Sequence, residues 1–420
     1  MVEFQRPRGT RDFGPEEMKV RRKAEEIMRG AIASFGYEEV STPTFEHAEL
    51  FIARSGPQII DQIYDFRDKG GRDLVLRPEL TAPVMRMYNS ELKKRSKPIR
   101  IFYFGNCFRY ERPQKGRFRE FWQMGLEYIG TRSPAANAEV INAAISSLRN
   151  LGLRDFVVRI GHVAILSSIL SSWGLQREVN SSLYTAIDKK DKEGIRELLE
   201  GTDEAERLVG MVSGTIPMDG IEEWSRSLTK SFPQVDQETV KELRNVFQLL
   251  DTNDCRVLLD PSIIRGLDYY DGVVFEIDAP NLGAEKQICG GGAYSLSVVF
   301  GSEVEGIGFG LGFDRILVAL NNEVPVKEEG KRIYVAALDE NSMKTAMEAS
   351  RIARMSGATC IMETTVRPLK KVIGSALNQN CTHLMIIGMD EVERGGVSIK
   401  DLVSKEQFFL KTEELPGYLC

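Results

Sequence analysis

Charged side chains occupy the stretch 105–130, where an ordinary sheet strand would carry aliphatic residues. The pattern predicts a hairpin of two antiparallel strands joined by a turn at Pro113 and Gly116. Residues two apart share one face of a strand, so several polar groups gather on one side of it. Burying such groups without partners is costly, so a polar ligand explains them, while a half-exposed hairpin with a basic tip is the structural alternative. These residues are Arg109, Glu111, Gln123 and Glu127.

The histidines and cysteines argue against several other chemistries. The three histidines, His47, His162 and His383, are widely separated, which disfavours histidine-based triads and histidine-rich metal sites. The six cysteines show no paired CxxC spacing, so neither a disulfide framework nor a zinc site is indicated. An enzyme of this composition would depend on charge stabilisation more than on proton shuttling.

Length and composition indicate a multidomain globular protein. A chain of 420 residues is too long for one ordinary core, so two or three domains are expected. No apolar run is long enough to span a bilayer, and the N-terminus lacks a secretory apolar segment, so we expect a soluble, cytoplasmic protein with no membrane partner. The net charge of −6 excludes a uniformly basic surface but leaves room for local nucleic-acid contacts.

The helices and strands that we predict around these polar residues change in type and order along the chain. Helices and strands are mixed up to about residue 162, and residues 163–254 follow as polar and acidic helical segments. Strands resume at Val257, and the glycine-rich run 306–315 leads from a strand into a helix without the G-x-G-x-x-G spacing of a Rossmann unit. From residue 332, strands and helices alternate, which predicts a small α/β domain.

Two stretches resemble motifs of the histidyl-tRNA synthetases, a family of class II aminoacyl-tRNA synthetases in subclass IIa. Residues 108–111, the loop after them and residues 123–127 resemble class II motif 2 in its histidyl form. Residues 265–270, Arg-Gly-Leu-Asp-Tyr-Tyr, match the motif Arg-Gly-Leu-x-Tyr-Tyr that is peculiar to this family. This second match is the most specific signal in the chain.

Three further stretches resemble parts of the same family. The helix that Pro15 opens and the strand ending at Pro43 resemble motif 1, which implies a homodimer through this region. An amphipathic helix packed within one domain is the alternative. Residues 306–315 resemble motif 3, whose alternating glycines would let a nucleotide lie close to the backbone. Residues 77–81 match the Arg-Pro-Glu-x-Thr segment that holds the substrate's α-amino group in the family.

The second motif peculiar to the family is altered here. Where relatives usually read Gly-Gly-Arg-Tyr-Asp, this chain carries Ala293 and Ser295 in place of the arginine and the aspartate. Both partners of an ion pair are lost together, whereas losing one would leave the other unpaired. We interpret the pair as structural and expect activity to survive its loss; a strong effect of mutating Tyr294 would contradict this interpretation.

The resemblance implies the fold and the domain organisation. The expected fold is α/β, with an α+β catalytic domain built on the class II antiparallel sheet flanked by helices, a helical insertion, and a small C-terminal α/β anticodon-binding domain. The catalytic domain would span 1–162 and 255–322, with the insertion at 163–254. A linker at 323–331 would lead to the anticodon-binding domain at 332–420.

The family also implies the substrates and the residues that bind them. L-Histidine would react with ATP, accompanied by Mg²⁺, and then pass to the 3′-terminal adenosine of tRNA(His). The attacking carboxylate is already an anion, so no general base is needed, and arginines and Mg²⁺ suit the stabilisation of the crowded phosphorus. Arg109 and Arg265 would be catalytic, on either side of the α-phosphate, and both would also contact histidine. The other ATP-binding residues would be Glu111, Arg117, Phe121 and Arg315, and the other histidine-binding residues Glu79, Thr81, Gln123, Glu127, Tyr269 and Tyr270.

Two basic clusters are weak candidates for RNA contact. Lys189–Lys192 in the insertion is interpreted first as a solvated face, with tRNA contact as the alternative. The same two interpretations apply to Arg367, Lys370 and Lys371 at the start of a C-terminal helix.

Two other functions remain to be distinguished. A regulatory relative, such as the synthetase-like subunit of the histidine-biosynthesis phosphoribosyltransferase, would bind histidine without catalysis, but such paralogues typically lack the C-terminal domain and some catalytic residues. Another class IIa synthetase is disfavoured by the run 265–270. Histidine-dependent pyrophosphate exchange separates an enzyme from a sensor.

Overall fold

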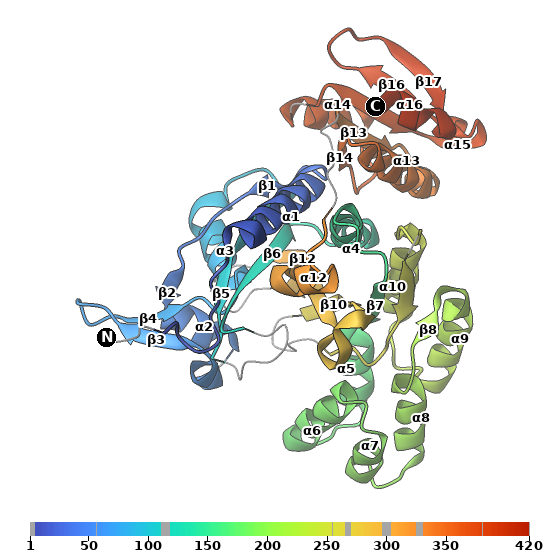
Figure 1. Ribbon diagram of the computed structural model, residues 1–420. Coiled ribbons are helices and arrows are strands. Elements are labelled where there is room, and N and C mark those ends of the chain that lie inside the picture. Colours follow the sequence, from blue (N-terminus) through green and yellow to red (C-terminus); the bar gives the residue numbers. More distant parts are fainter. Residues whose placement is uncertain are drawn as a thin grey trace.

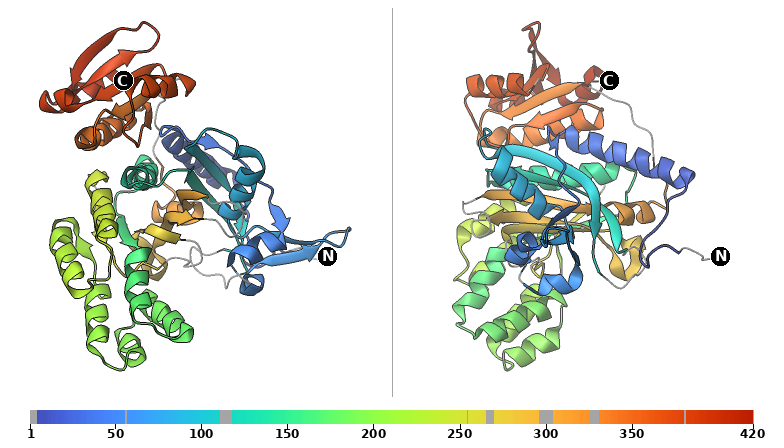
Figure 2. Two further views of the ribbon diagram at one scale, coloured as in Figure 1. Left: turned by 180° about the vertical axis from the view of Figure 1, so that it is seen from behind. Right: turned by 90° about the vertical axis from the view of Figure 1, so that its left-hand side faces the viewer.

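The computed structural model describes residues 5–55, 57–110, 118–253, 255–264, 270–295, 304–324, 331–379 and 381–419. A large central sheet with flanking helices carries a helical region on one side and a smaller sheet domain on another (Figures 1 and 2). The mixed α/β fold expected from the sequence is confirmed. Within the described residues, no helix combines the length and apolar character that crossing a bilayer takes.

The central sheet is mainly antiparallel. Its strand order is β1-β5-β6-β12-β11-β10-β7-β9-β8, with β1–β5 and β7–β9 paired parallel and the other neighbours antiparallel. The predicted hairpin is present, since β5 and β6 pair from Ile99 opposite Ile129 to Phe108 opposite Glu120. The strands are β1 (Glu38–Glu39), β5 (Ile99–Phe108), β6 (Glu120–Ile129), β7 (Val157–His162), β8 (Ile216–Pro217), β9 (Arg256–Leu259), β10 (Tyr270–Asp278), β11 (Gln287–Ser295) and β12 (Glu305–Gly312).

Different helices cover the two faces of β5 and β6. Helices α1 (Pro15–Ala33) and α4 (Pro134–Asn150) pack on the face that carries Leu126 and Tyr128. Helix α3 (Thr81–Met87) packs with Ile101 and Tyr103 on the opposite face. Because successive strand residues point to opposite faces, the alternate positions Phe121, Gln123 and Glu127 share the face that α3 covers.

Local sequence signals explain where the flanking elements begin and end. Pro15 opens α1 at its first turn with acids beside it, and Gly36 adopts φ +82° after its end. Ser133 caps α4 by accepting a hydrogen bond from the backbone N–H of Ala136. Further short elements near the N-terminus are β2 (Phe45–His47), α2 (Ala48–Ser55), β3 (Tyr64–Arg67) and β4 (Asp73–Leu76), and α12 (Phe313–Ala319) follows β12.

The helical region lies between β7 and β9 and has its own core. Leu183, Ile195 and Leu208 belong to a cluster of buried side chains from several of its helices. The short strand β8 was not predicted and joins the edge of the central sheet through β9. The helices are α5 (Val163–Ser172), α6 (Arg177–Asp188), α7 (Lys192–Leu198), α8 (Asp203–Val212), α9 (Ile221–Ser231) and α10 (Gln237–Leu249).

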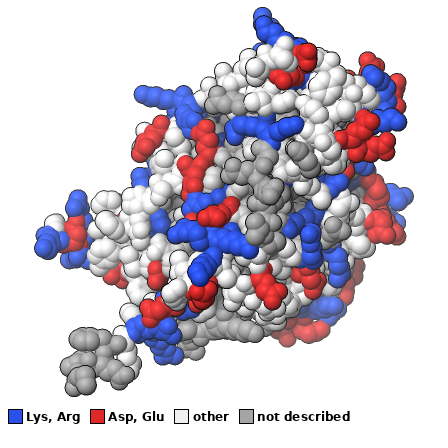
Figure 3. Space-filling model, turned by 45° about the horizontal axis from the view of Figure 1, so that its top comes forward, with Lys and Arg blue, Asp and Glu red and all other residues white. Residues whose placement is uncertain are grey.

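The C-terminal domain is a five-stranded sheet in the order β14-β13-β15-β16-β17 with helices packed against it. Strand β13 lies between β14 and β15 and pairs parallel with both, as expected for alternating strands and helices. The elements are β13 (Arg332–Ala337), α13 (Met343–Met355), β14 (Thr359–Met362), α14 (Leu369–Asn378), β15 (His383–Ile387), α15 (Met389–Glu393), β16 (Gly396–Asp401), β17 (Gln407–Lys411) and α16 (Leu415–Leu419). In the face shown in Figure 3, Lys and Arg side chains are interspersed with Asp and Glu.

Candidate active site

Glu127 of β6 is the centre of a buried polar cluster and is only 1% exposed. Tyr103 of β5 donates its hydroxyl to Glu127 Oε1 at 3.0 Å, and Tyr294 of β11 donates to Oε2 at 2.8 Å. Burial raises the pKa of both tyrosines and the Glu127 charge raises it further, so both hydroxyls remain protonated donors. A carboxylate is buried at tolerable cost only when it is bonded in this way.

Two glycines of β12 make room for this cluster. Gly308 lies opposite Glu127 in the β12–β6 register, and a Cβ at Gly308 would collide with Glu127 Oε2. A Cβ at Gly306 would lie 2.9 Å from the Tyr294 hydroxyl. The space above these two glycines is therefore filled by side chains of the protein itself rather than kept free for a nucleotide.

The next two glycines of β12 continue the same face toward Arg315. A Cβ at Gly310 would lie 3.8 Å from Gln123 Nε2, and one at Gly312 would lie 3.7 Å from Arg315 Cδ. Residues two apart share a face, so the glycines at 306, 308, 310 and 312 form one stripe. Along this glycine stripe, Glu127 and Gln123 of β6 are followed by Arg315 at the start of α12.

The segment before α3 brings two predicted residues to this face. Glu79 accepts hydrogen bonds from the backbone N–H groups of Thr81, at 2.5 Å, and Ala82, at 3.0 Å. Thr81 Oγ1 lies 3.2 Å from the hydroxyl of Tyr103, which in turn bonds Glu127. Glu79 thus binds backbone donors at the first turn of α3, and Thr81 is part of the Glu127 cluster.

Arg109 and Gln123 are each fixed by a neighbour. Arg109 Nε donates to the carbonyl of Pro78 at 2.9 Å, and its guanidinium carbon lies 5.1 Å from the centre of the Phe121 ring. Cys107 Sγ donates to Gln123 Oε1 at 3.4 Å. Burial raises the pKa of the Cys107 thiol to about 12, so it stays protonated and can donate this bond.

Arg315 is held at the start of α12. Its Nη1 donates to the carbonyl of Gln287 in β11 at 2.6 Å. The preceding Asp314 is 3% exposed and accepts from Arg21 Nη1 of α1 and from the backbone N–H of Trp122 in β6, both at 2.7 Å. Asp314 therefore ties the helix that carries Arg315 to the strand that carries Gln123 and Glu127.

Tyr270 of β10 is the remaining predicted site residue that the structure describes. It pairs with Tyr294 in the β10–β11 register, and its ring lies 2.9 Å from where a Cβ of Gly292 would be. The structure thus brings together eight of the residues expected in the site: Glu79, Thr81, Arg109, Phe121, Gln123, Glu127, Tyr270 and Arg315. The other four, Glu111, Arg117, Arg265 and Tyr269, lie outside the described residues.

An arginine from elsewhere in the chain lies beside the altered motif. Arg132 Nη2 is 2.9 Å from Asp271 Oδ1, and Arg132 Nη1 donates to Ser295 Oγ at 3.2 Å. A Cβ at Gly272 would lie 2.9 Å from Arg132 Nη2 and 3.0 Å from the Cβ of Ala293. The Arg132–Asp271 ion pair thus stands next to the two positions where relatives usually carry their own arginine and aspartate.

Sequence reasoning did not assign Tyr103 and Cys107 to the site. Both lie on β5 at alternate positions, on the face that α3 covers, so the period of two was the available signal. Tyr294 was noted in the sequence but was expected to be dispensable, whereas in the structure it bonds Glu127 directly.

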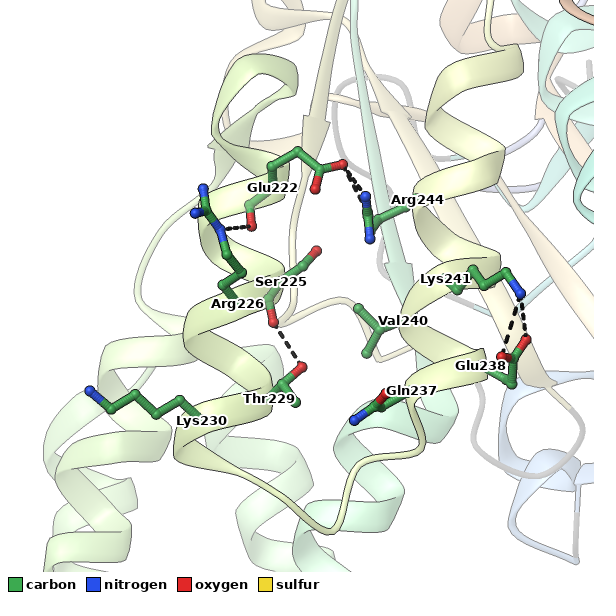
Figure 4. A pocket seen from close by; sticks show the side chains of 10 residues that line it. All are labelled: Glu222, Ser225, Arg226, Thr229, Lys230, Gln237, Glu238, Val240, Lys241 and Arg244. Carbon is green, nitrogen blue, oxygen red and sulfur yellow. Dashed lines mark hydrogen bonds and ion pairs between the residues drawn. The ribbon is translucent and has the colours of Figure 1, made fainter.

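A separate pocket of 520 Å³ lies in the helical region between α9 and α10 (Figure 4). Its polar residues pair mainly with one another, as Arg244 does with Glu222 and Lys241 with Glu238. This pocket contains none of the predicted site residues. In the part of the chain that the structure describes, no three His, Cys, Asp or Glu side chains are grouped to hold a metal ion.

The fold and the site together define a class of protein. A mainly antiparallel sheet, with the polar residues of motif 2 on one strand and a glycine-rich strand leading to an arginine beside it, is the arrangement of the class II aminoacyl-tRNA synthetases. A sequence model described as Histidyl-tRNA synthetase matches residues 9–316. The chain belongs to the histidyl-tRNA synthetase family.

Relatives match over almost the whole chain. A protein of Archaeoglobus fulgidus named histidine–tRNA ligase is 43% identical over 416 residues, covering 99% of both chains. One of the same name from Methanocaldococcus jannaschii is 40% identical and covers 100% of both. A solved structure from Bacillus halodurans, described as an ATP phosphoribosyltransferase regulatory subunit/histidyl-tRNA synthetase, has a TM-score of 0.67 at 26% identity and covers 92% of this chain and 99% of its own.

Proposed function

We propose that this chain is a histidine–tRNA ligase, which activates L-histidine with ATP and transfers it to the 3′-terminal adenosine of tRNA(His). The observation that carries the proposal is the Glu127 cluster, a buried carboxylate held by Tyr103 and Tyr294. This cluster suits the imidazole of histidine, which can donate a hydrogen bond from a ring nitrogen.

In this proposal Glu127 accepts a bond from one imidazole nitrogen, and Tyr269 or Tyr270 bonds the other. Both tyrosine donors of Glu127 come from strands on either side, so the carboxylate is fixed before the substrate arrives. An amino acid lacking the imidazole donor would leave Glu127 with an unmet acceptor, and rejection of this kind can reach roughly 10⁴-fold. Glu79, Thr81 and Gln123 would hold the α-amino group of the substrate.

Activation is a displacement at the α-phosphorus of ATP. The histidine carboxylate forms a bond to this phosphorus, and the bond to the leaving pyrophosphate breaks. Arg109 would contact the α-phosphate and the substrate carboxylate, with Arg265 on the other side. Arg117 would hold the distal phosphates, Phe121 and Arg315 would enclose the adenine, and Glu111 would face its amino edge. Arg109 and Phe121 already lie together in the structure, at 5.1 Å.

Mg²⁺ would accompany the ATP phosphates and supply charge neutralisation there, and we assign it no protein ligands. In the second step a ribose hydroxyl of the terminal adenosine attacks the adenylate carbonyl, and AMP leaves. A phosphate oxygen of the adenylate would take the hydroxyl proton, since no protein base has been assigned.

The remaining features of the proposal concern assembly. The domain limits 1–162, 163–254, 255–322, 323–331 and 332–420 would apply, with the last part binding the anticodon. The region around α1 would form the interface of a homodimer, and the protein would act in the cytoplasm.

The test is histidine-dependent exchange of pyrophosphate into ATP by the purified protein. Exchange that requires histidine supports the proposal, whereas histidine binding without exchange would support the regulatory alternative. Arg265→Ala should then lower the exchange rate strongly with little change in histidine binding. An unaffected rate would refute the role assigned to Arg265.

A further inference from the structure

The C-terminal domain is in close contact with the sheet that carries the Glu127 cluster, the proposed histidine site. The backbone N–H of Cys360 in β14 donates to the carbonyl of Ser34, just beyond α1. A Cβ at Gly36 would lie 2.5 Å from Ile361 Cγ1, and the guanidinium of Arg354 lies 3.4 Å from the centre of the Phe35 ring. Two parts of the chain that are far apart in sequence thus fit together closely at the end of α1.

A buried polar network crosses this contact. Arg100 of β5 donates through Nη2 to the hydroxyl of Tyr128 in β6 and to the carbonyl of Met362 in the C-terminal domain, both at 2.8 Å. The same Tyr128 hydroxyl lies 2.7 Å from Thr364 Oγ1. Arg100 Nε also donates to Glu139 of α4 at 3.2 Å. Arg100 and Glu139 are 8% and 0% exposed, so the network is screened from water.

The network is connected to Glu127 through the backbone of β6. Tyr128 directly follows Glu127, and successive strand residues point to opposite faces. Tyr128 therefore points to the C-terminal domain while Glu127 points into the pocket. A displacement of Tyr128 moves the peptide unit that it shares with Glu127.

On the other side, the network lies next to a basic segment of the C-terminal domain. Glu363, between Met362 and Thr364, accepts from Arg367 Nη1 at 2.8 Å and from the Tyr334 hydroxyl at 3.0 Å. Arg367 begins the basic cluster that was considered for RNA contact in the sequence. If Arg367 changed its bonding partner, Glu363 would be affected first. Glu363 lies between Met362, which contacts Arg100, and Thr364, which contacts Tyr128.

The contact is not fully satisfied in this structure. Glu139 Oε2 is buried and has no hydrogen-bond partner among the described residues. Leaving such an oxygen without a partner costs roughly 1–3 kcal/mol. A contact that carries this cost can change to an arrangement in which Glu139 Oε2 is bonded, which makes it a candidate for a two-state element.

We propose that Arg100 and Tyr128 are positioning residues that couple tRNA binding by the C-terminal domain to histidine binding by Glu127. In this proposal, tRNA favours an arrangement of the domain contact in which the network is complete and the β6 backbone holds Glu127 more firmly. Bound tRNA then lowers the dissociation constant for histidine, and histidine tightens tRNA binding by the same factor, because coupling is reciprocal. The proposal rests on the proposed function.

The experiment compares four full-length proteins: the wild type, Tyr128→Phe, Thr364→Val and the double variant. The histidine dissociation constant is measured by calorimetry with and without tRNA(His). Pyrophosphate exchange without tRNA is measured in parallel. We expect tRNA to tighten histidine binding by roughly fivefold or more in the wild type. The factor should fall below about twofold in both single variants, and the double variant should be no worse than either.

Tyr37→Phe is the matched control. It also removes one buried tyrosine hydroxyl at the same contact, and its ring packs edge-on against Tyr128 at 6.2 Å, but its hydroxyl bonds to nothing among the described residues. The wild-type coupling factor should persist in this variant. Thr364→Val changes a residue of the C-terminal domain and removes the same bond between Tyr128 and Thr364. It therefore tests this bond even if Tyr128→Phe folds poorly.

Three results would overturn the proposal: no effect of tRNA on histidine affinity in the wild type, an undiminished factor in Tyr128→Phe and Thr364→Val, or equal loss in Tyr37→Phe. Failure of the proposed function would look different, because the wild type would then show no histidine-dependent exchange at all.

Discussion

Two buried glutamates lie on opposite faces of the same sheet and are held by different donors. Glu127 accepts from the neutral hydroxyls of Tyr103 and Tyr294, whereas Glu139 accepts from the guanidinium of Arg100. Hydroxyl donors fix a carboxylate without bringing a positive charge, while a guanidinium neutralises it. Glu127 is thus oriented for a further donor, whereas Glu139, at the domain contact, already has a cationic partner for one of its oxygens.

The two glutamates also differ in the space beside their carboxylates. Glu127 lies over the glycine stripe of β12, where Gly308 leaves room for its carboxylate. Glu139 belongs to α4, and it is 0% exposed beneath the C-terminal domain. The comparison teaches that burial alone does not identify a functional acid; the chemistry of its donors and the space beside it do.

Arg100→Met is expected to have the largest effect on stability. Removing one partner of a buried ion pair leaves Glu139 uncompensated and costs about 3–5 kcal/mol. Urea unfolding measures the loss. The double variant Arg100→Met/Glu139→Gln should recover much of this free energy, because no buried charge is then left alone. A double variant as unstable as the single one would show that Arg100 acts mainly through Tyr128 and Met362.

Glu127→Gln should separate the two glutamates by function. The amide keeps the shape but loses the charge, so the bond to an imidazole N–H weakens, and kcat/KM for histidine in pyrophosphate exchange should fall by roughly 100-fold. The matched control is Glu139→Gln, which should change exchange without tRNA by less than about twofold. Equal losses in both variants would contradict the assignment of Glu127 to the pocket.

Removing one tyrosine donor should have a smaller effect. Tyr294→Phe and Tyr103→Phe each take one hydroxyl from Glu127, so KM for histidine should rise about tenfold in each. The result for Tyr294 also tests the interpretation of the altered motif, which expected activity to be insensitive there. An unchanged KM in Tyr294→Phe would support that interpretation. It would mean that the 2.8 Å hydrogen bond from Tyr294 to Glu127 does not contribute to histidine binding.

Much of the grouping around Glu127 could be predicted because its residues lie close together in sequence or in recognisable runs. The period of two placed Gln123 and Glu127 on one face, and the glycine run pointed to Arg315. Tyr103 was missed because a donor from the neighbouring strand depends on strand pairing, which a single sequence does not specify. The domain contact was missed for a stronger reason: Arg100 and Met362 are 262 positions apart, and nothing local in either segment signals the other.

The cluster Lys189–Lys192 also makes a contact that its local sequence does not signal. The interpretation as a solvated face agrees with the exposure of all four residues. It did not reveal that Lys190 Nζ lies 3.0 Å from Asp260 Oδ2, and Asp260 is 0% exposed. Arg159 and Ser262 also bond this carboxylate. Asp260 is thus another buried acid, held by both a hydroxyl and cations, and it ties the helical region to the central sheet.

The pH dependence of stability should reveal the contribution of Lys190. Burial alone would raise the pKa of Asp260, but hydrogen bonds from Ser262 and Arg159 and the charge of Lys190 outweigh it, so the pKa is lowered on folding. An acid with a lowered pKa stabilises the fold above its unfolded pKa, about 3.9, and this stability is lost as the pH falls through the folded value. Lys190→Met should therefore cost about 0.5–1 kcal/mol at pH 7, since Lys190 is 39% exposed and partly screened. The difference from wild type should shrink as the pH falls toward 3, and the adjacent Lys189→Met should show no such difference. A constant difference at every pH would mean that Lys190 acts through packing rather than through the charge of Asp260.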